Sequence, residues 1–188
     1  MSGSASRRER AAKAKQERAQ ERLARRLEKE DIVLAFDYDP RALGYHGPVI
    51  NTDLTITDAQ AQALASAGQR VPDPVRCRFL IDTGADSTVV KHEFAERAGL
   101  KIINDNLPLH GVGVDTTGKA YMGRILFTTK SKFAEAMHHM YVDTQVMGAT
   151  LESDLIDGLI GRDVLMHFQL TYDGRTGAVR MKYYRPVK

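Results

Sequence analysis

The sequence predicts one mostly β domain behind a charged N-terminal segment. Short apolar runs that end at glycine, proline or aspartate recur from residue 32 onwards, and such runs are typical of strands. The chain has 188 residues and 43% hydrophobic side chains, which is enough for one good core and short for two. We therefore expect residues 1–30 to form a tail and residues 31–188 to form a single folded domain.

The tail carries the excess positive charge of the chain. It contains ten Lys or Arg and five Glu, a net charge of +5, whereas residues 31–188 contribute −2. Residues 7–29 are rich in helix-favouring types, but Leu23 and Leu27 are their only large apolar side chains, so we expect a solvated, fraying helix or a disordered tail. An arm for nucleic acid or another anionic surface is the alternative, and the interleaved Glu residues argue against it.

The elements before the central motif are predicted from apolar runs and from residues that break the chain. Thr57 and Asp58 can cap a helix, Gly68 can end it, and Pro72 with Pro74 returns the chain to the next strand. In order, we expect a strand at 32–36, breaks at 39–40 and 44–48, a strand at 49–56, a helix at 59–67 within an insert at 57–75, and a strand at 75–81.

The most informative stretch is an Asp-Thr-Gly turn between two apolar runs. Residues 78–81 lead into the turn and residues 88–90 lead out, so rigid strands should hold it. Asp82 supplies an acid/base group, Thr83 a hydroxyl that can bond to backbone, and Gly84 an N–H that is free for the carboxylate. These residue types are also common in surface turns, so the tripeptide alone leaves both interpretations open.

The elements after this turn are predicted in the same way. Residues 91–98 have helical spacing, and Gly99 ends that helix. In order, we then expect a glycine-containing hairpin at 109–121, strands at 121–128 and 140–146 joined by a polar loop, a short helix at 163–168, and strands at 168–172 and 179–184 joined by a turn at 173–177.

A second segment strengthens the interpretation of the Asp-Thr-Gly turn. The apolar run 155–160 ends at Gly161 and is followed by Arg162 and Asp163, which can open a short helix. The two segments together resemble the retropepsin family. Its protomers carry Asp-Thr-Gly-Ala and, some tens of residues later, two apolar residues followed by Gly, Arg and Asp or Asn. The resemblance covers roughly residues 75–184, with both motifs in order.

This resemblance implies a closed-barrel-like aspartic protease fold with one lobe per chain, short helices and a flap hairpin. It implies a homodimer in which two Asp82 carboxylates share one proton and activate water against a peptide bond. Thr83 would bond across the two-fold axis, and Gly84 would orient the carboxylate. The alternative function is a dimeric peptide-binding module that cleaves slowly or never. A third possibility is an adaptor whose basic tail binds nucleic acid.

Further site residues are implied by the same resemblance. The substrate-binding residues would be Ala85, Asp86, Gly111, Val112 and Gly113, the last three from the flap. Arg162 would support the site by pairing with Asp86. A helix at 91–98 is a feature of cellular and bacterial relatives and not of retroviral ones, so a bacterial or cellular type is favoured.

We expect no cofactor, no metal and no membrane partner. Cys77 is the single cysteine and is expected to be a buried small hydrophobe. His138 and His139 are adjacent, so on a strand they would face opposite ways, and we expect them to be solvated. With no long apolar run and charge near the N-terminus, we expect a cytoplasmic protein that acts on peptide or protein substrates.

Overall fold

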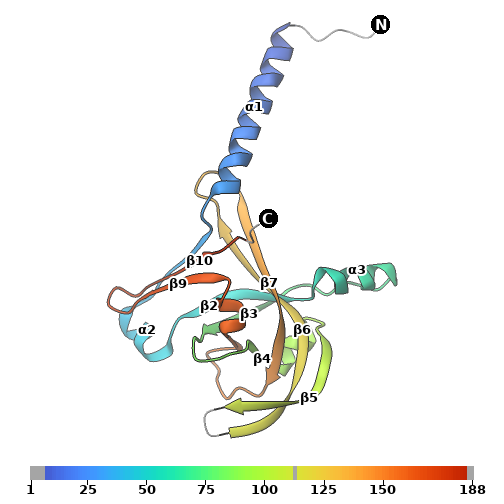
Figure 1. The fold of residues 1–188 in the computed structure, drawn as a ribbon, viewed down its shortest axis with the longest axis vertical. Coiled ribbons are helices and arrows are strands. Elements are labelled where there is room, and N and C mark those ends of the chain that lie inside the picture. Colours follow the sequence, from blue (N-terminus) through green and yellow to red (C-terminus); the bar gives the residue numbers. More distant parts are fainter. Residues whose placement is uncertain (1–6, 112–113, 186–188) are drawn as a thin grey trace.

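The computed structural model describes residues 7–111 and 114–185. Its strands form two sheets, and the larger one closes into a barrel (Figure 1). In spatial order its strands are β2 (Val49–Thr55), β3 (Val75–Ile81), β8 (Gly158–Ile160), β4 (Val89–Lys91), β7 (Met137–Ala149), β6 (Val114–Lys130) and β5 (Lys101–Gly111). Pairing of β2 with β6 closes a ring of six strands, and β5 extends the sheet beyond β6. The prediction of a mostly β, closed-barrel fold is confirmed.

The smaller sheet joins the two ends of the folded part. Its antiparallel strands, in spatial order, are β1 (Val33–Asp37), β10 (Ala178–Tyr183) and β9 (Phe168–Asp173). The two sheets share one hydrophobic core, to which β1 contributes Leu34 and β10 contributes Met181. The ring of Phe168 packs edge-on against that of Phe127 in β6, with centroids 5.0 Å apart. The smaller sheet is thus part of the same folded unit as the barrel.

Helix α2 (Pro40–His46) lies where chain breaks at 39–40 and 44–48 were predicted, so that prediction was wrong. Asp39 Oδ1 accepts hydrogen bonds from the backbone N–H groups of Arg41 and Ala42, each at 2.9 Å. Pro40 takes the first helical position, where a missing N–H costs nothing. Leu43 is buried and holds the helix on the core. Here the Asp-Pro pair begins a helix and not a turn.

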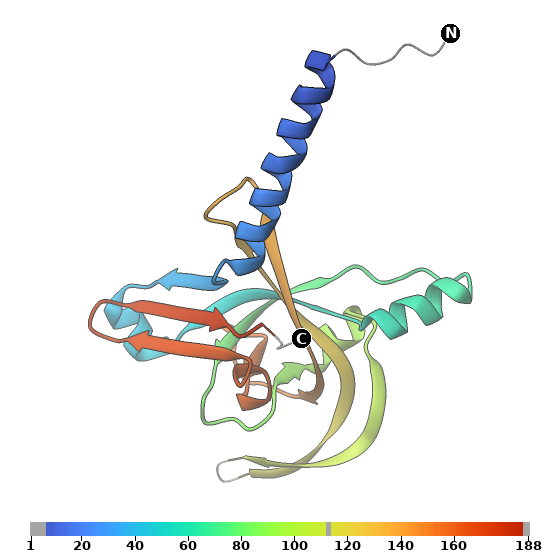
Figure 2. The same ribbon diagram turned by 45° about the horizontal axis from the view of Figure 1, so that its top comes forward.

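The predicted helices on either side of the Asp-Thr-Gly turn are confirmed as α3 (Asp58–Ser66) and α4 (His92–Arg97). Thr57 and Gln60 form a capping box at the start of α3. Helix α3 projects away from the barrel (Figure 2). None of its side chains is buried. Its first residue, Asp58, binds the guanidinium of Arg124 in β6 at 2.6 Å, which fixes the base of the projecting helix.

Several boundaries in the second half differ from the prediction. Strands β6 and β7 are longer than expected, so His138 and His139 lie within β7 and not in a loop. His139 is exposed, as expected for a solvated histidine, whereas His138 is half-buried, with 14% of its side chain exposed. Helix α5 (Arg162–Leu165) ends earlier than predicted, because Phe168 already begins β9 and packs into the core.

A buried carboxylate fixes the base of helix α1 (Arg7–Lys29), which projects from the barrel (Figure 1). Glu30, directly after the helix, is only 6% exposed. Its carboxylate accepts hydrogen bonds from Ser131 Oγ at 2.7 Å and Lys132 N at 2.6 Å, and it lies 2.9 Å from His138 Nε2. The expectation of a solvated His138 is therefore wrong, because this ring is held against a buried acid.

Substitution Glu30→Gln is expected to lower stability at neutral pH and to remove an acid-dependent loss of stability. Burial raises the pKa of the Glu30 carboxyl, but hydrogen bonds from Lys132, His138 and Ser131 outweigh burial and lower the pKa from 4.5 to about 2. Ionised Glu30 therefore stabilises the fold above pH 4.5, and this contribution disappears as the pH falls toward 2. Urea unfolding at a series of pH values should show that the difference in free energy of unfolding between parent and variant shrinks over this interval.

The matched control is Glu28→Gln, which removes an exposed carboxylate two residues away. It should change the free energy of unfolding by less than about 0.5 kcal/mol. If the free energies of unfolding of parent and Glu30→Gln differ by the same amount from neutral to acidic pH, the assigned role of Glu30 is contradicted.

Candidate active site

The loop at 82–88 connects β3 to β4, and β8 lies between these two strands in the barrel. Asp82 follows β3 directly, and its N–H donates to Ile160 O of β8 at 3.0 Å. The preceding N–H, of Ile81, donates to Pro48 O at 3.0 Å. Buried strands therefore carry the Asp-Thr-Gly turn, and they bring the two sequence motifs into contact.

The Asp82 carboxylate is oriented by the backbone of its own turn. Asp82 Oδ1 accepts hydrogen bonds from Gly84 N at 2.9 Å and from Ala85 N at 3.3 Å. Within the described residues, Oδ2 has no hydrogen-bond partner. Asp82 is half-buried, while Thr83 and Gly84 are exposed. One carboxylate oxygen is thus held in place by two backbone N–H groups of the turn.

Arg162 holds the outer side of this turn. Its Nη1 donates to the carbonyl oxygens of Thr83 and Gly84, at 2.9 and 2.8 Å. Its backbone N–H donates to Ala85 O at 3.0 Å. The expected pairing of Arg162 with Asp86 is wrong. Among the described residues no ion pair joins Arg162 to Asp86, because the guanidinium is turned to the carbonyl groups and Asp86 is exposed. Arg162 therefore supports the loop by binding backbone groups of the loop.

Asp163 connects the loop to the barrel, a role that the sequence analysis missed. Its carboxylate accepts hydrogen bonds from Thr88 Oγ1 and from Thr144 Oγ1 of β7, both at 2.8 Å. Thr88 is fully buried, and its hydroxyl also accepts from Gly161 N at 3.2 Å. The family pattern marks this position, because Asp or Asn follows Gly-Arg in it. The partners of Asp163 were not predictable, because they lie far away in the sequence.

Two glycines let the second motif approach the first closely. A Cβ atom on Gly161 would lie 2.5 Å from backbone atoms of Ser87, and one on Gly158 would lie 2.4 Å from Val89 O. Separations under 3.0 Å are not tolerated between such atoms, and backbone cannot move aside cheaply. Both positions therefore require glycine.

An ion pair between the exposed Arg78 and the buried Asp157 ties β3 to the segment before β8. Asp157 is 5% exposed, and it accepts from Arg78 N at 2.8 Å, Nη2 at 2.8 Å and Nε at 3.1 Å. Burial raises the pKa of the Asp157 carboxyl, but the bonds from Arg78 outweigh burial and hold the pKa below its ordinary value. This pair keeps the strand that carries Asp82 in register with β8.

Half-exposed apolar side chains lie next to Asp82 on the same face of the sheet. Leu80 pairs with Leu159, and Leu159 pairs with Val89 on its other side. Residues opposite one another in a sheet share a face, and so do residues two apart in a strand, which places Asp82 on the face of Leu80. This row can contact apolar side chains of an extended ligand.

The predicted hairpin is present as β5 and β6, which pair from Lys101 with Met122 to Gly111 with Val114. Gly111 is the last residue of β5. The candidate residues Val112 and Gly113 lie outside the described residues. In the part of the chain that the structure describes, no hydrogen bond links this hairpin to the Asp82 loop, so its role over a ligand stays a prediction.

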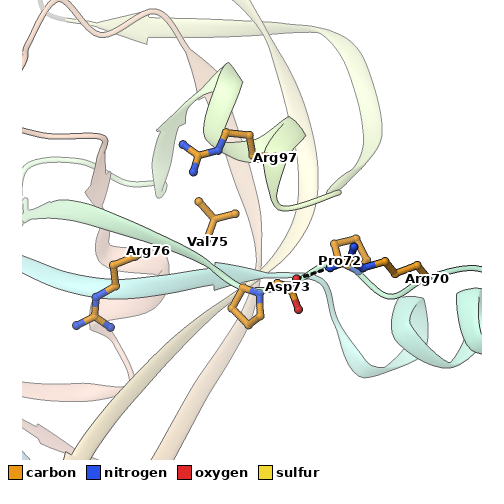
Figure 3. A pocket seen from close by; sticks show the side chains of 7 residues that line it. Arg70, Pro72, Asp73, Val75, Arg76 and Arg97 are labelled. Atoms are coloured by element: carbon orange, nitrogen blue, oxygen red, sulfur yellow. Dashed lines mark hydrogen bonds and ion pairs between the residues drawn. The ribbon is translucent and has the colours of Figure 1, made fainter.

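An open cleft of about 460 Å³ lies on another part of the surface (Figure 3). It is lined by Arg70, Pro72, Asp73, Pro74, Val75, Arg76 and Arg97. Arg70 pairs with Asp73 at 2.7 Å and Arg76 with Asp53 at 3.2 Å, so these guanidinium groups already have carboxylate partners. The cleft does not include the Asp82 loop.

The described residues bring no group of three or more His, Cys, Asp or Glu side chains together. Of the helices in residues 7–111 and 114–185, none is both long and apolar enough to cross a membrane. Cys77 is free and buried, and burial raises the pKa of its thiol to about 12.

Comparison with known proteins agrees with this geometry. A family model described as aspartyl protease matches residues 67–164, more than half of the chain. The chain therefore belongs to the aspartyl protease family, and the resemblance to retropepsins is confirmed. The match includes the Asp82 loop, the β5–β6 hairpin and the Gly161-Arg162 segment. No curated protein and no solved structure matched the chain.

Proposed function

We propose that the protein is an aspartic endopeptidase that is active as a homodimer. One observation carries the proposal: each chain presents a single Asp82 carboxylate on an exposed loop, with one oxygen held by two backbone N–H groups. Hydrolysis by paired carboxylates requires one ionised and one protonated group. A second copy of the chain would supply the second group.

In the proposed reaction, the ionised Asp82 of one protomer takes a proton from a water molecule held between the two loops. The water oxygen attacks the carbonyl carbon of the peptide, while the protonated Asp82 of its partner gives its proton to the carbonyl oxygen. A neutral tetrahedral intermediate forms. Transfer of a proton to the amide nitrogen then lets the C–N bond break, which releases a carboxylic acid and an amine and consumes one water.

The contacts around the turn support this assignment. Gly84 N–H fixes the orientation of the carboxylate before substrate arrives, which favours a preorganised site. Arg162 holds the carbonyl groups of Thr83 and Gly84, so the turn keeps its shape while its outer side stays exposed. By analogy with the family, the Thr83 hydroxyl would bond to the same loop of the second protomer.

The substrate would be an extended peptide. The row formed by Leu80, Leu159 and Val89 supports contacts with its apolar side chains, because these residues are half-exposed and share a face with Asp82. The remaining candidate contacts are Ala85 and Asp86 from the loop and Gly111, Val112 and Gly113 from the hairpin.

The proposal predicts cleavage that depends on protein concentration, because a monomer holds half of the site. Specific activity on a peptide library, followed by mass spectrometry, should fall when the protein is diluted below the dissociation constant of the dimer measured by sedimentation. Constant specific activity in samples that sediment as monomers would contradict the shared site. A dimer that binds peptides without cutting them would favour the binding module instead.

A further inference from the structure

Helix α1 gathers five of its ten basic residues on one face and three of its four Glu residues on another. The basic face consists of Lys15, Arg18, Arg22, Arg25 and Lys29. The acidic face consists of Glu17, Glu21 and Glu28. Successive residues turn by about 100°, so the spacing of three and four residues puts the basic face within an arc of about 80° and the acidic face within about 40°. The centres of the two arcs lie about 100° apart.

The Glu residues of the helix do not neutralise its basic face. Glu residues alternate with basic ones along the chain, but a helix sorts residues by their position around its axis. No Glu of α1 falls inside the arc of the basic face. A continuous positive surface therefore runs along the helix.

The basic face has no partner within the described residues. All five of its residues are exposed, and none has a carboxylate within ion-pair distance among them. The pair between Lys13 and Glu17, at 4.0 Å, belongs to the other side of the helix. Residues 31–188 carry a net charge of −2, so the positive charge of the molecule is concentrated on this helix.

The helix is attached firmly at its C-terminal end. Besides the buried Glu30 carboxylate, Arg185 Nη2 donates to Leu27 O at 2.8 Å and to Glu30 O at 3.1 Å. The Arg26 guanidinium lies over the Phe133 ring, 4.5 Å from its centroid. Figures 1 and 2 both show the helix standing away from the barrel next to the β6–β7 turn.

The basic face continues onto the barrel at this junction. An open cleft of about 360 Å³ there is lined by Arg25, Arg26, Lys29 and Phe133. The adjacent β6–β7 hairpin carries Lys130 and Lys132, both exposed. A ligand that follows the basic face would therefore meet further cations at the base of the helix.

We infer that α1 is a docking arm for double-stranded DNA, which it contacts through phosphate groups. A helix of 23 residues is about 35 Å long and about 10–12 Å wide, and the major groove of B-DNA is about 12 Å wide. The arm is rich in Arg, whose guanidinium matches phosphate geometry. Bound DNA would hold peptide or protein ligands of the barrel close to the duplex.

Other polyanions fit the arm less well. The major groove of A-form RNA is too narrow to admit a helix. Single strands are held by stacking on aromatic rings, and residues 7–29 contain no aromatic residue. An interfacial membrane helix needs an apolar face, whereas Leu23 and Leu27 are the only large apolar residues in this segment.

A pair of matched double variants of the full chain tests the inference. Lys15→Gln with Arg18→Gln removes one Lys and one Arg from the basic face. Arg10→Gln with Lys13→Gln removes one of each from outside it. Binding to a fluorescent DNA duplex is measured by anisotropy over a series of salt concentrations, and circular dichroism checks that both variants keep the helix.

The basic-face variant should flatten the slope of log K against log salt by about 1.8 and weaken binding at least about tenfold near 0.1 M salt. The other variant should weaken binding less than about threefold. Equal losses in the two variants, or parent binding that ignores salt, would overturn the inference. So would tighter binding to duplex RNA, to a single strand or to vesicles of anionic lipid than to the DNA duplex.

Discussion

Substitution Asp82→Asn is expected to reduce peptide cleavage by at least about 10²- to 10⁴-fold while leaving the fold intact. In a homodimer the change removes both members of the catalytic pair, and an amide can neither accept nor donate the proton that the reaction moves. The fold should survive, because the amide oxygen of Asn can still accept the hydrogen bond from Gly84 N–H that Asp82 Oδ1 accepts in the parent.

The matched control is Asp154→Asn, which makes the same charge change at an exposed position outside the loop and should cleave like the parent. Initial rates and thermal melts of the three proteins separate loss of chemistry from loss of structure. Parent-like cleavage by Asp82→Asn would refute the assignment of the carboxylate.

Mixing parent and Asp82→Asn chains sharpens the same prediction. If protomers exchange freely, an equal mixture contains about one quarter parental dimers, and the activity per parent chain falls by about half. If each chain worked alone, added variant would have no effect. This measurement distinguishes a site shared between protomers from a site that is complete in one chain.

The sequence predicted the parts of this molecule that depend on local signals. The Asp82 turn lies where two apolar runs meet, and the capping pattern at Thr57 gave α3 with nearly correct bounds. The resemblance carried by the two motifs also implied that Arg162 lies against the Asp82 loop. The hydrogen-bond partners of Arg162 were not predictable, because tertiary geometry decides between the Asp86 carboxylate and two carbonyl groups.

Other features could not be read from local pattern. An Asp-Pro pair serves a turn or a helix start equally well, so α2 was missed. Glu30 looked like one more charge of the tail, yet its burial depends on a hairpin about a hundred residues away in sequence. The faces of α1, in contrast, can be read from the sequence, since the 3.6-residue period separates charges that alternate along the chain.

Substitution Gly161→Ala is expected to destabilise the protein by about 1–3 kcal/mol and to lower cleavage as well. The backbone at Gly161 has φ −87° and ψ −178°, which any residue adopts, so the cost is one of space and not of conformation. The new methyl group would lie 2.5 Å from the carbonyl carbon and oxygen of Ser87. Relief of that overlap must displace the loop that carries Asp82, or α5 with Arg162, so stability and activity should fall together.

The matched control is Gly44→Ala, which adds the same methyl group to helix α2. A Cβ atom at Gly44 meets no other heavy atom within 4 Å, so this variant should be more stable than the parent by about 0.5–1 kcal/mol. Urea unfolding gives both free energies, and cleavage rates at 25 °C give the effect on the site. A Gly161→Ala protein as stable and as active as the parent would show that the two motifs are not packed as closely as the structure describes, because the methyl group would then have room that the Ser87 backbone does not leave.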